Sequence, residues 1–502
     1  MIREVKTENG LVRGLPAADP RITSFKGIPF AAPPIGENRW RAPQPCKDWD
    51  GILEAYEFAP ISVQDTPGLG TDIYCREWHV DPEIPMDEDC LYLNVWTGAK
   101  SADEKLPVFV WFFGGGLQWG YPAEMEFDGE RMARRGVIVV TVNYRLGALG
   151  FMAHPEITAA QPEAPANFGN LDQQAGLRWV IRNIEAFGGD PKNITIGGQS
   201  AGGGSVMTQL ASPTNAGAFQ KAIVMSGMIR SPYSSDYFLG ARDLKGAEEM
   251  GKKFIEFLGV NNIEEARKLD AFFIRDKYAE FRGSHGMFGT VVDGVYTMGD
   301  PLTMINENKY NKVPIMAGNT ADEFLSFIPA ASDEEFKEKV QKLFGDKAEE
   351  FLKFEEAWKK NGNNYALVSG LECTVKSTFL NNETNGNGND CYYYRFAPDI
   401  PGWDNPGTFH SVDLWFFFET LAKCWRPFVG RHYDLARQMC NYFTNFMKSG
   451  NPNGEDADGT QMPVWESYTK ANPAEMVFTP DGSVSQVEDS EFIKFLVKVM
   501  GE

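Results

Sequence analysis

The chain of 502 residues has a formal net charge of −21, and 43% of its residues are hydrophobic. This composition supplies a large buried core, and the acidic surface disfavours nucleic acid and anionic membranes as partners. No apolar run reaches the roughly 18 residues of a membrane-spanning helix, and "MIREVKTENG" at the N-terminus lacks the pattern of a secretory signal. We therefore expect a cytoplasmic globular protein; export of a processed form stays open as the alternative.

The cysteines and acidic residues do not indicate a metal site. Seven cysteines form no disulfide framework, and no closely spaced Cys/His group suggests zinc. The segment "EDADG" (455–459) lacks the closing glutamate of a calcium loop. Cys75 and Cys90 could pair in an oxidising compartment, but free thiols are the default without an export signal. We expect no metal and no cofactor.

Four continuous apolar segments indicate strands buried on both faces. They are residues 106–116, 136–145, 193–198 and 221–227. Between the second and third, residues 172–189 place apolar side chains on one helical face, opened by an acidic residue and closed by glycine: Leu177, Val180, Ile181, Ile184 and Phe187. Strands that alternate with helices predict an α/β fold with a mostly parallel sheet flanked by helices.

Beyond about residue 230 the pattern becomes mainly helical. One apolar stripe comprises Leu435, Met439, Tyr442, Phe443 and Phe446, and "SGNPNG" ends that helix. No internal repeat and no linker interrupts the chain. The sequence therefore predicts one domain over residues 1–502, with helical insertions after about residue 230.

The segment "FGGDPKNITIGGQSAGGGS" (187–205) places a lone serine, Ser200, among glycines directly after a predicted strand. Residues 198–202 fit G-x-S-x-G in a strand–turn–helix context, in which a strained turn presents a nucleophilic hydroxyl. The G-x-S-x-G motif alone is weak evidence for a catalytic serine, because any glycine-rich turn can match it. The strand before it favours a nucleophile over a purely structural turn.

A serine hydroxyl needs a base to become a nucleophile, and in this architecture the base follows the serine in the chain. Of the five histidines, His285, His410 and His432 follow Ser200. His410 lies in a small-residue turn, "GTFHS", as a loop-borne base should. His432 begins an amphipathic helix, and His285 leaves little chain for an intervening acid.

The base in turn needs an orienting carboxylate. Asp322 and Glu323 stand just past an apolar strand in "VPIMAGNTADEFLSF". Composition alone does not decide which of the two is the orienting acid.

The chain resembles the type-B carboxylesterases of the carboxylesterase/cholinesterase family, with a bacterial-like character. The serine signature F-G-G-x4-I-x-I-x-G-x-S-A-G is matched in full over residues 187–202, and "EDCLYLNVW" (88–96) is similar to the second signature, although its last positions drift. Three further blocks agree: "NYRLGALGF", "NFGNLDQQAGLRWV" and "GNPNG". The resemblance implies an α/β-hydrolase fold and ester hydrolysis.

The resemblance also implies site residues. It maps the acid onto Glu323 and the base onto His410, and it assigns the oxyanion-hole amides to Gly115, Gly116 and Ala201.

Two departures from the family are visible. Phe113 replaces a histidine often found before the glycine run, and Gln199 replaces the glutamate of cholinesterases. The second change removes a negative charge beside the nucleophile, which disfavours a cationic, choline-like substrate.

The function that follows is a serine carboxylesterase that cleaves uncharged small-molecule esters through an acyl-enzyme. A non-catalytic binding or adhesion relative and an amidase with the same triad are the alternatives. Trp119, Phe288 and Trp415 are predicted to line the substrate pocket, with core packing as the alternative role. Aromatic walls favour short or aromatic, hydroxycinnamate-type esters. The sequence does not indicate the oligomeric state.

Overall fold

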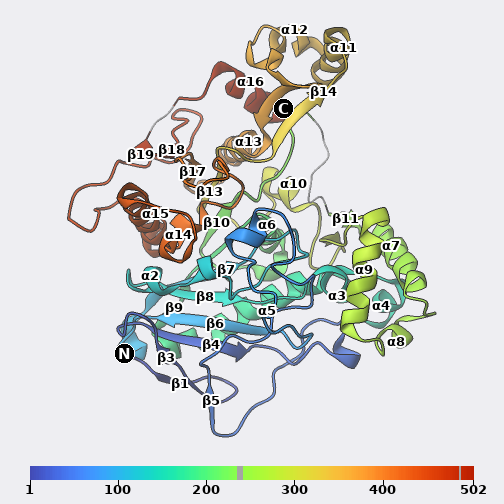
Figure 1. Cartoon of the computed structure of the whole chain (residues 1–502), viewed down its shortest axis with the longest axis vertical. Coiled ribbons are helices and arrows are strands. Elements are labelled where there is room, and N and C mark those ends of the chain that lie inside the picture. The colour runs from blue at the N-terminus through green and yellow to red at the C-terminus, as the bar shows by residue number, and fades with distance from the viewer. Residues whose placement is uncertain (234–240, 486–487, 502) are drawn as a thin grey trace.

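The computed structural model describes residues 1–233, 241–485 and 488–501. Within this part an 11-stranded sheet runs through the molecule in the order β19-β18-β17-β13-β10-β9-β7-β8-β6-β4-β3 (Figure 1). Its strands are β3 (Leu15–Pro16), β4 (Thr23–Pro29), β6 (Tyr92–Thr97), β7 (Leu106–Phe112), β8 (Ile138–Val142), β9 (Gly189–Gln199), β10 (Lys221–Met225), β13 (Ile315–Thr320), β17 (Cys391–Phe396), β18 (Met476–Thr479) and β19 (Gly482–Ser485).

The predicted mostly parallel sheet is confirmed. From β8 to β18 every neighbouring pair is parallel, whereas the pairs at both ends of the sheet are antiparallel. All four predicted strands are present, with different ends. β7 stops at Phe112, so the glycines after it leave the sheet, and β9 starts four residues before its predicted first residue, at Gly189.

Helices cover both faces of the sheet, and β7 shows how its residues divide between two cores. Val108, Val110 and Phe112 share one core with α5 (Phe168–Asn183), α6 (Ala201–Ala211) and α13 (Gly370–Thr384). Phe109 and Trp111 face the opposite core, because alternate side chains of a strand point to opposite faces. α14 (Leu414–Phe417) and α15 (Gly430–Ser449) contribute to this second core.

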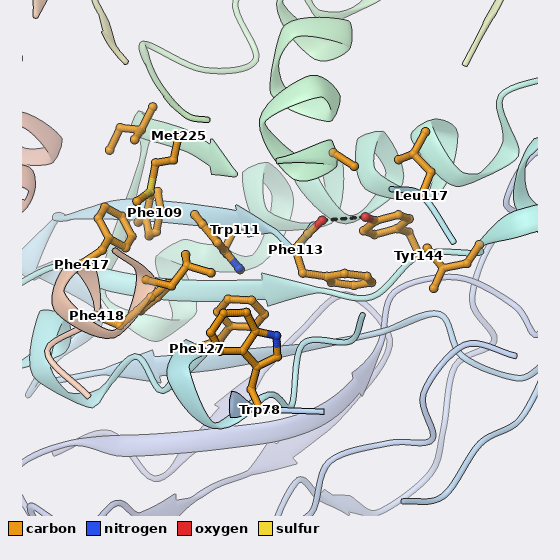
Figure 2. Packing of buried hydrophobic residues seen from close by; sticks show 14 of the residues in the cluster. Trp78, Phe109, Trp111, Phe113, Leu117, Phe127, Tyr144, Met225, Phe417 and Phe418 are labelled. Carbon is orange, nitrogen blue, oxygen red and sulfur yellow. Dashed lines mark hydrogen bonds between the residues drawn. The ribbon is translucent and has the colours of Figure 1, made fainter. Parts of the chain in front are cut away.

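Figure 2 shows aromatic rings packed in the second core. The Trp111 ring meets Phe418 edge-on, with centroids 5.1 Å apart, and contacts Phe127 at 5.4 Å. Phe417 lies edge-on to Phe109 at 5.7 Å. Edge-to-face contacts of this kind add stability beyond the burial of apolar area. They tie the segment after His410 to β7.

The predicted helix over residues 172–189 begins earlier than expected. α5 starts at Phe168, because Asn167 adopts a left-handed φ of 62° and turns the chain there. Asp172, taken as the opening acidic residue, is instead buried inside the helix. Its carboxylate accepts hydrogen bonds from the backbone N–H, Nε and Nη2 of Arg145 at 3.0, 2.8 and 2.7 Å. This pair links α5 to the loop that follows β8.

Beyond residue 230 the described chain is mainly helical, and residues 234–240 lie outside the described part. α7 (Leu244–Phe257), α8 (Ile263–Ala266) and α9 (Ala271–His285) gather to one side of the sheet (Figure 1). α11 (Asp333–Phe344), α12 (Ala348–Phe351) and α16 (Glu491–Gly501) pack on a small sheet of β14 (Leu325–Pro329), β15 (Lys360–Asn361) and β16 (Asn364–Ser369). The predicted helix with the apolar stripe is α15, and Gly450 follows it with a φ of 80°.

The remaining α-helices and strands of the described chain are short. They are β1 (Glu4–Lys6), β2 (Leu11–Arg13), β5 (Ile52–Glu54), α1 (Tyr74–Glu77), α2 (Glu130–Ala133), α3 (Gly147–Phe151), α4 (Pro155–Ala160), β11 (Arg242–Asp243), β12 (Val291–Val292) and α10 (Pro301–Asn306). All seven cysteines fall within the described residues and are free thiols, so Cys75 and Cys90 are not bonded. Among the helices described, none combines the length and hydropathy that crossing a bilayer requires.

Candidate active site

The predicted catalytic residues lie in loops at one edge of the sheet. Ser200 directly follows β9, the glycine loop follows β7, Glu323 follows β13, and His410 lies in the segment after β17. These strands are parallel, so their carboxyl ends meet at the same edge, where open α/β sheets bind ligands.

Ser200 stands on a strained turn between β9 and α6. Its φ of 56° and ψ of −125° lie outside the regions that residues with a side chain favour. Its N–H donates to the carbonyl of Met225, and its carbonyl accepts from the N–H of Gly204, both at 2.9 Å. A Cβ on Gly202 would lie 2.1 Å from the Phe112 carbonyl oxygen, so only glycine fits there. The glycine cluster therefore allows a sharp turn that carries the serine.

The glycine loop after β7 lies against this turn. Gly115 and Gly116 have left-handed φ angles of 103° and 63°, and a Cβ on Gly114 would lie 3.1 Å from the Ser200 Cβ. Among the described residues, the N–H groups of Gly115, Gly116 and Ala201 have no hydrogen-bond acceptor. Unused amide donors beside a serine can stabilise a developing oxyanion.

Phe113 anchors the start of the glycine loop. Its ring is fully buried and stacks on Tyr144 with centroids 4.3 Å apart, and the Tyr144 hydroxyl donates to the Phe113 carbonyl at 2.7 Å (Figure 2). The aromatic side chain at this position thus belongs to the core and fixes the backbone where the loop begins.

Glu323 and His410 form a short buried hydrogen bond. His410 Nδ1 lies 2.6 Å from Glu323 Oε2, and the exposed fractions of the two side chains are 7% and 0%. The Thr320 N–H donates to Glu323 Oε1 at 3.2 Å. Burial opposes ionisation of Glu323, but the charge and hydrogen bond of His410, supported by Ser226 and Thr320, outweigh it and lower the pKa of this carboxyl. Glu323 is therefore ionised, and it accepts a hydrogen bond from the Nδ1–H of His410.

Asp322, the other acid that the sequence left open, points elsewhere. Its Oδ2 accepts from the N–H and the Oγ1 of Thr408 at 2.7 and 3.0 Å. Asp322 thus holds the loop that carries His410, whereas Glu323 contacts the imidazole itself.

The second nitrogen of His410 faces the nucleophile turn. Because Nδ1 carries the proton toward Glu323, Nε2 holds the lone pair, and the Gln199 amide donates to it at 3.3 Å. Gln199 is buried and precedes Ser200, so the imidazole lone pair is directed at the Gln199–Ser200 segment.

The other two histidines that follow Ser200 serve local structure. His285 ends α9 and stacks on Phe281 with centroids 4.2 Å apart. His432 is buried in the first turn of α15, where its Nδ1 accepts from the N–H of Val429 at 3.0 Å.

Asp413 is a site residue that the sequence reasoning missed. It is fully buried three residues after His410, and its Oδ2 accepts from the Tyr394 hydroxyl at 2.9 Å. Its Oδ1 has no hydrogen-bond partner among the described residues. Burial, reinforced by the nearby charge of Glu323, raises the pKa of Asp413 to about 7. The only sequence signal was an acid at short spacing from His410 before an apolar run.

We expect Asp413→Asn to change the pH dependence of stability. The pKa of Asp413 is 3.8 in its ordinary state and about 7 in the folded protein, so between about pH 4 and pH 7 the folded protein holds a proton that the unfolded chain has already released. The wild type should therefore lose about 3 kcal/mol of unfolding free energy, relative to the variant, between about pH 5 and pH 8. Urea unfolding at both pH values measures this; an equal difference at both would contradict it.

Of the three aromatic residues predicted to line the pocket, one lies beside the glycine loop and two are packed in the core. The Trp119 ring passes within 3.7 Å of a Cβ built on Gly116, so it lies beside the glycine loop. Trp415 is fully buried, packs on Trp78 and donates its Nε1–H to a buried carboxylate. Phe288 is 3% exposed in an aromatic cluster of α7 and α9. Neighbouring rings cover both Phe288 and Trp415, as the core-packing alternative expects, and their place in the substrate pocket stays a prediction.

Trp119 is held by two residues that sequence reasoning missed. Its Nε1–H donates to Asp65 Oδ2 at 3.0 Å, and the Arg282 guanidinium lies over its ring, 5.1 Å from the centroid. Arg282 also forms an ion pair with Asp65. Three distant segments thus fix the indole, a contact that no sequence pattern could indicate.

Comparisons with known proteins identify the family of the chain. The model of the "Carboxylesterase family" matches residues 2–496, so the chain belongs to the carboxylesterase family. It is 30% identical to the para-nitrobenzyl esterase of Bacillus subtilis (strain 168), over 99% of each chain, and 31% identical to a cholinesterase of Mus musculus, over 92% of this chain and 81% of that protein. A Geobacillus stearothermophilus carboxylesterase structure matches with a TM-score of 0.75 and 28% identity, covering 99% of this chain and 100% of that one.

The fold is accordingly the α/β-hydrolase fold, and the protein is a carboxylic ester hydrolase of the bacterial-like type-B group. A catalytic triad and an oxyanion hole are typical of this family.

Proposed function

We propose that the enzyme cleaves uncharged carboxylic esters through a covalent acyl-enzyme, with Ser200 as nucleophile, His410 as general base and Glu323 as the orienting acid. The observation that carries this proposal is the chain of contacts from Glu323 through His410 to the nucleophile turn. Carboxylate, imidazole and serine turn follow one another in the order that the triad mechanism requires.

The reaction follows from these positions. His410 Nε2 exchanges the Gln199 amide for the Ser200 hydroxyl and takes its proton as Oγ attacks the ester carbonyl. The carbonyl oxygen becomes an oxyanion, and the free N–H groups of Gly115, Gly116 and Ala201 are the proposed donors to it. The imidazolium then protonates the leaving alcohol. Water, activated by the same histidine, releases the acid and restores Ser200.

The substrate class follows from the charges and the wall of the site. Gln199 places no negative charge beside Ser200, so the site offers no specific attraction for a cationic ester. The chain as a whole has a charge of −21, which disfavours anionic esters. The indole of Trp119 offers an apolar face beside the glycine loop. Neutral esters that carry an aromatic group, including hydroxycinnamate-type esters, are the proposed substrates.

We expect Trp119→Ala to lower kcat/KM for an aromatic ester by about three- to tenfold, because an aromatic contact contributes about 0.5–1.5 kcal/mol. The measurement compares methyl ferulate, a short aliphatic ester and a long-chain triglyceride in the wild type and the variant. Trp403→Ala is the matched control, since Trp403 is 78% exposed and packs against Arg76 and Trp425.

Three outcomes would redirect the proposal. Preference for the triglyceride would indicate a lipase-like enzyme, and indifference of the Trp119 variant to the aromatic ester would leave a plain short-chain esterase. Faster turnover of the matching anilide than of the ester would favour an amidase that uses the same triad.

A further inference from the structure

The residue after Glu323 also contacts His410. The Phe324 ring lies over the imidazole with centroids 4.6 Å apart and planes tilted by 38°. As a whole residue Phe324 is 50% exposed, whereas His410 and Glu323 are both buried. Phe324 therefore lies between His410 and solvent on this side of the hydrogen-bonded pair.

Two consecutive residues thus hold the imidazole from two directions. Glu323 binds its Nδ1 edge, and Phe324 covers its face. The turn that carries them is fixed at both ends: the Ala321 N–H donates to the Phe396 carbonyl at 2.8 Å, and Leu325 pairs with Ser369 at the start of β14. A side chain on a turn fixed in this way can define the plane of a ring packed on it.

We propose that Phe324 is a positioning residue for His410: its ring fixes the imidazole plane and keeps water from the Glu323–His410 hydrogen bond. The inference rests on the proposed function, in which His410 is the base.

Two physical reasons support this role. The hydrogen bonds at Nδ1 and Nε2 both lie in the plane of the imidazole, so they leave the ring free to tilt about the line that joins them. A small misplacement of Nε2 relative to Ser200 costs rate steeply. The face of an aromatic ring also attracts a cation, so Phe324 stabilises the imidazolium that forms as Ser200 gives up its proton. Excluding water strengthens the attraction between that imidazolium and Glu323.

The kinetic test uses a series at residue 324 with a small ester, such as p-nitrophenyl acetate. Phe324→Ala should lower kcat by about 10- to 100-fold and leave KM within about threefold, because the ring acts through His410. Phe324→Tyr keeps the ring and should retain most of the activity, while Phe324→Leu, which keeps only apolar cover, should fall between. Leu325→Ala is the matched control, because Leu325 is 49% exposed and adjacent in sequence.

A spectroscopic test separates positioning from a general structural effect. In protein labelled with ¹⁵N-histidine, the His410 Nδ1 proton is identified by its loss in Glu323→Gln. In Phe324→Ala this proton should exchange with water at least about tenfold faster, whereas Leu325→Ala should match the wild type. If the alanine variant does not fold, the leucine variant serves in both tests.

An unchanged exchange rate, a kcat within twofold of the wild type, an effect confined to KM, or an equal effect of Leu325→Ala would each overturn the inference. The exchange measurement does not need turnover. Faster exchange in an enzyme whose activity does not depend on Ser200 would therefore refute the proposed function while supporting the positioning of His410 by Phe324.

Discussion

Replacing Ser200 with alanine is expected to lower kcat about a millionfold, as loss of a triad nucleophile does in other serine hydrolases. The fold should be unaffected, because alanine has the same Cβ and meets the same strain at a φ of 56°. The two anchoring bonds of Ser200, to Met225 and Gly204, involve only its backbone. Measurements of kcat and of thermal unfolding on the same preparation test both parts.

A fluorophosphonate probe provides the control for this prediction. It should label the peptide that contains Ser200 in the wild type and nothing in Ser200→Ala. Ser205→Ala is the matched variant, since Ser205 lies one turn along α6 with its hydroxyl bonded to Gln173 at 2.9 Å; it should keep both labelling and turnover. Label on another serine, or near-normal turnover without Ser200, would remove the nucleophile assignment.

Replacing Glu323 with glutamine is expected to lower kcat by about 10³- to 10⁴-fold. The neutral amide cannot offset the positive charge that His410 acquires, and it can hold the imidazole in the wrong tautomer by donating to Nδ1. The 2.6 Å bond between Glu323 and His410 is the contact at stake. Since the change acts on the transition state, kcat and kcat/KM should fall together while KM changes little.

Asp322→Asn is the matched control for Glu323→Gln. The asparagine Oδ1 can still accept both hydrogen bonds from Thr408, so the loop that carries His410 should stay in place. We expect a loss below about tenfold. If the two variants ranked the other way, Asp322 would be the orienting acid and the role given to Glu323 would be refuted.

The nucleophile turn is the part of the site that sequence predicts best. Its glycines lie within eight residues of one another, and Gly202 avoids a clash with the backbone of the neighbouring strand at Phe112. His410 was reached by elimination among few histidines, and Glu323 only through the family resemblance. Local sequence says least about the aromatic side chains, because the burial of Phe288 and Trp415 depends on rings from distant segments.

The sequence by itself determined the alternation of strands and helices, the serine on its strained turn and the set of candidate acids and histidines. The reason is that these features depend on local spacing and on glycines, which adopt backbone conformations that other residues cannot. Tertiary structure decided which acid meets His410 and that Phe324 covers it. It also buried Asp413 close enough to feel the charges of Glu323 and His410, with its Oδ1 left without a hydrogen-bond partner among the described residues. The hydrogen bond between Glu323 and His410 joins residues 87 positions apart. The packing of the whole sheet sets the distances between such residues, and local sequence patterns do not encode that packing.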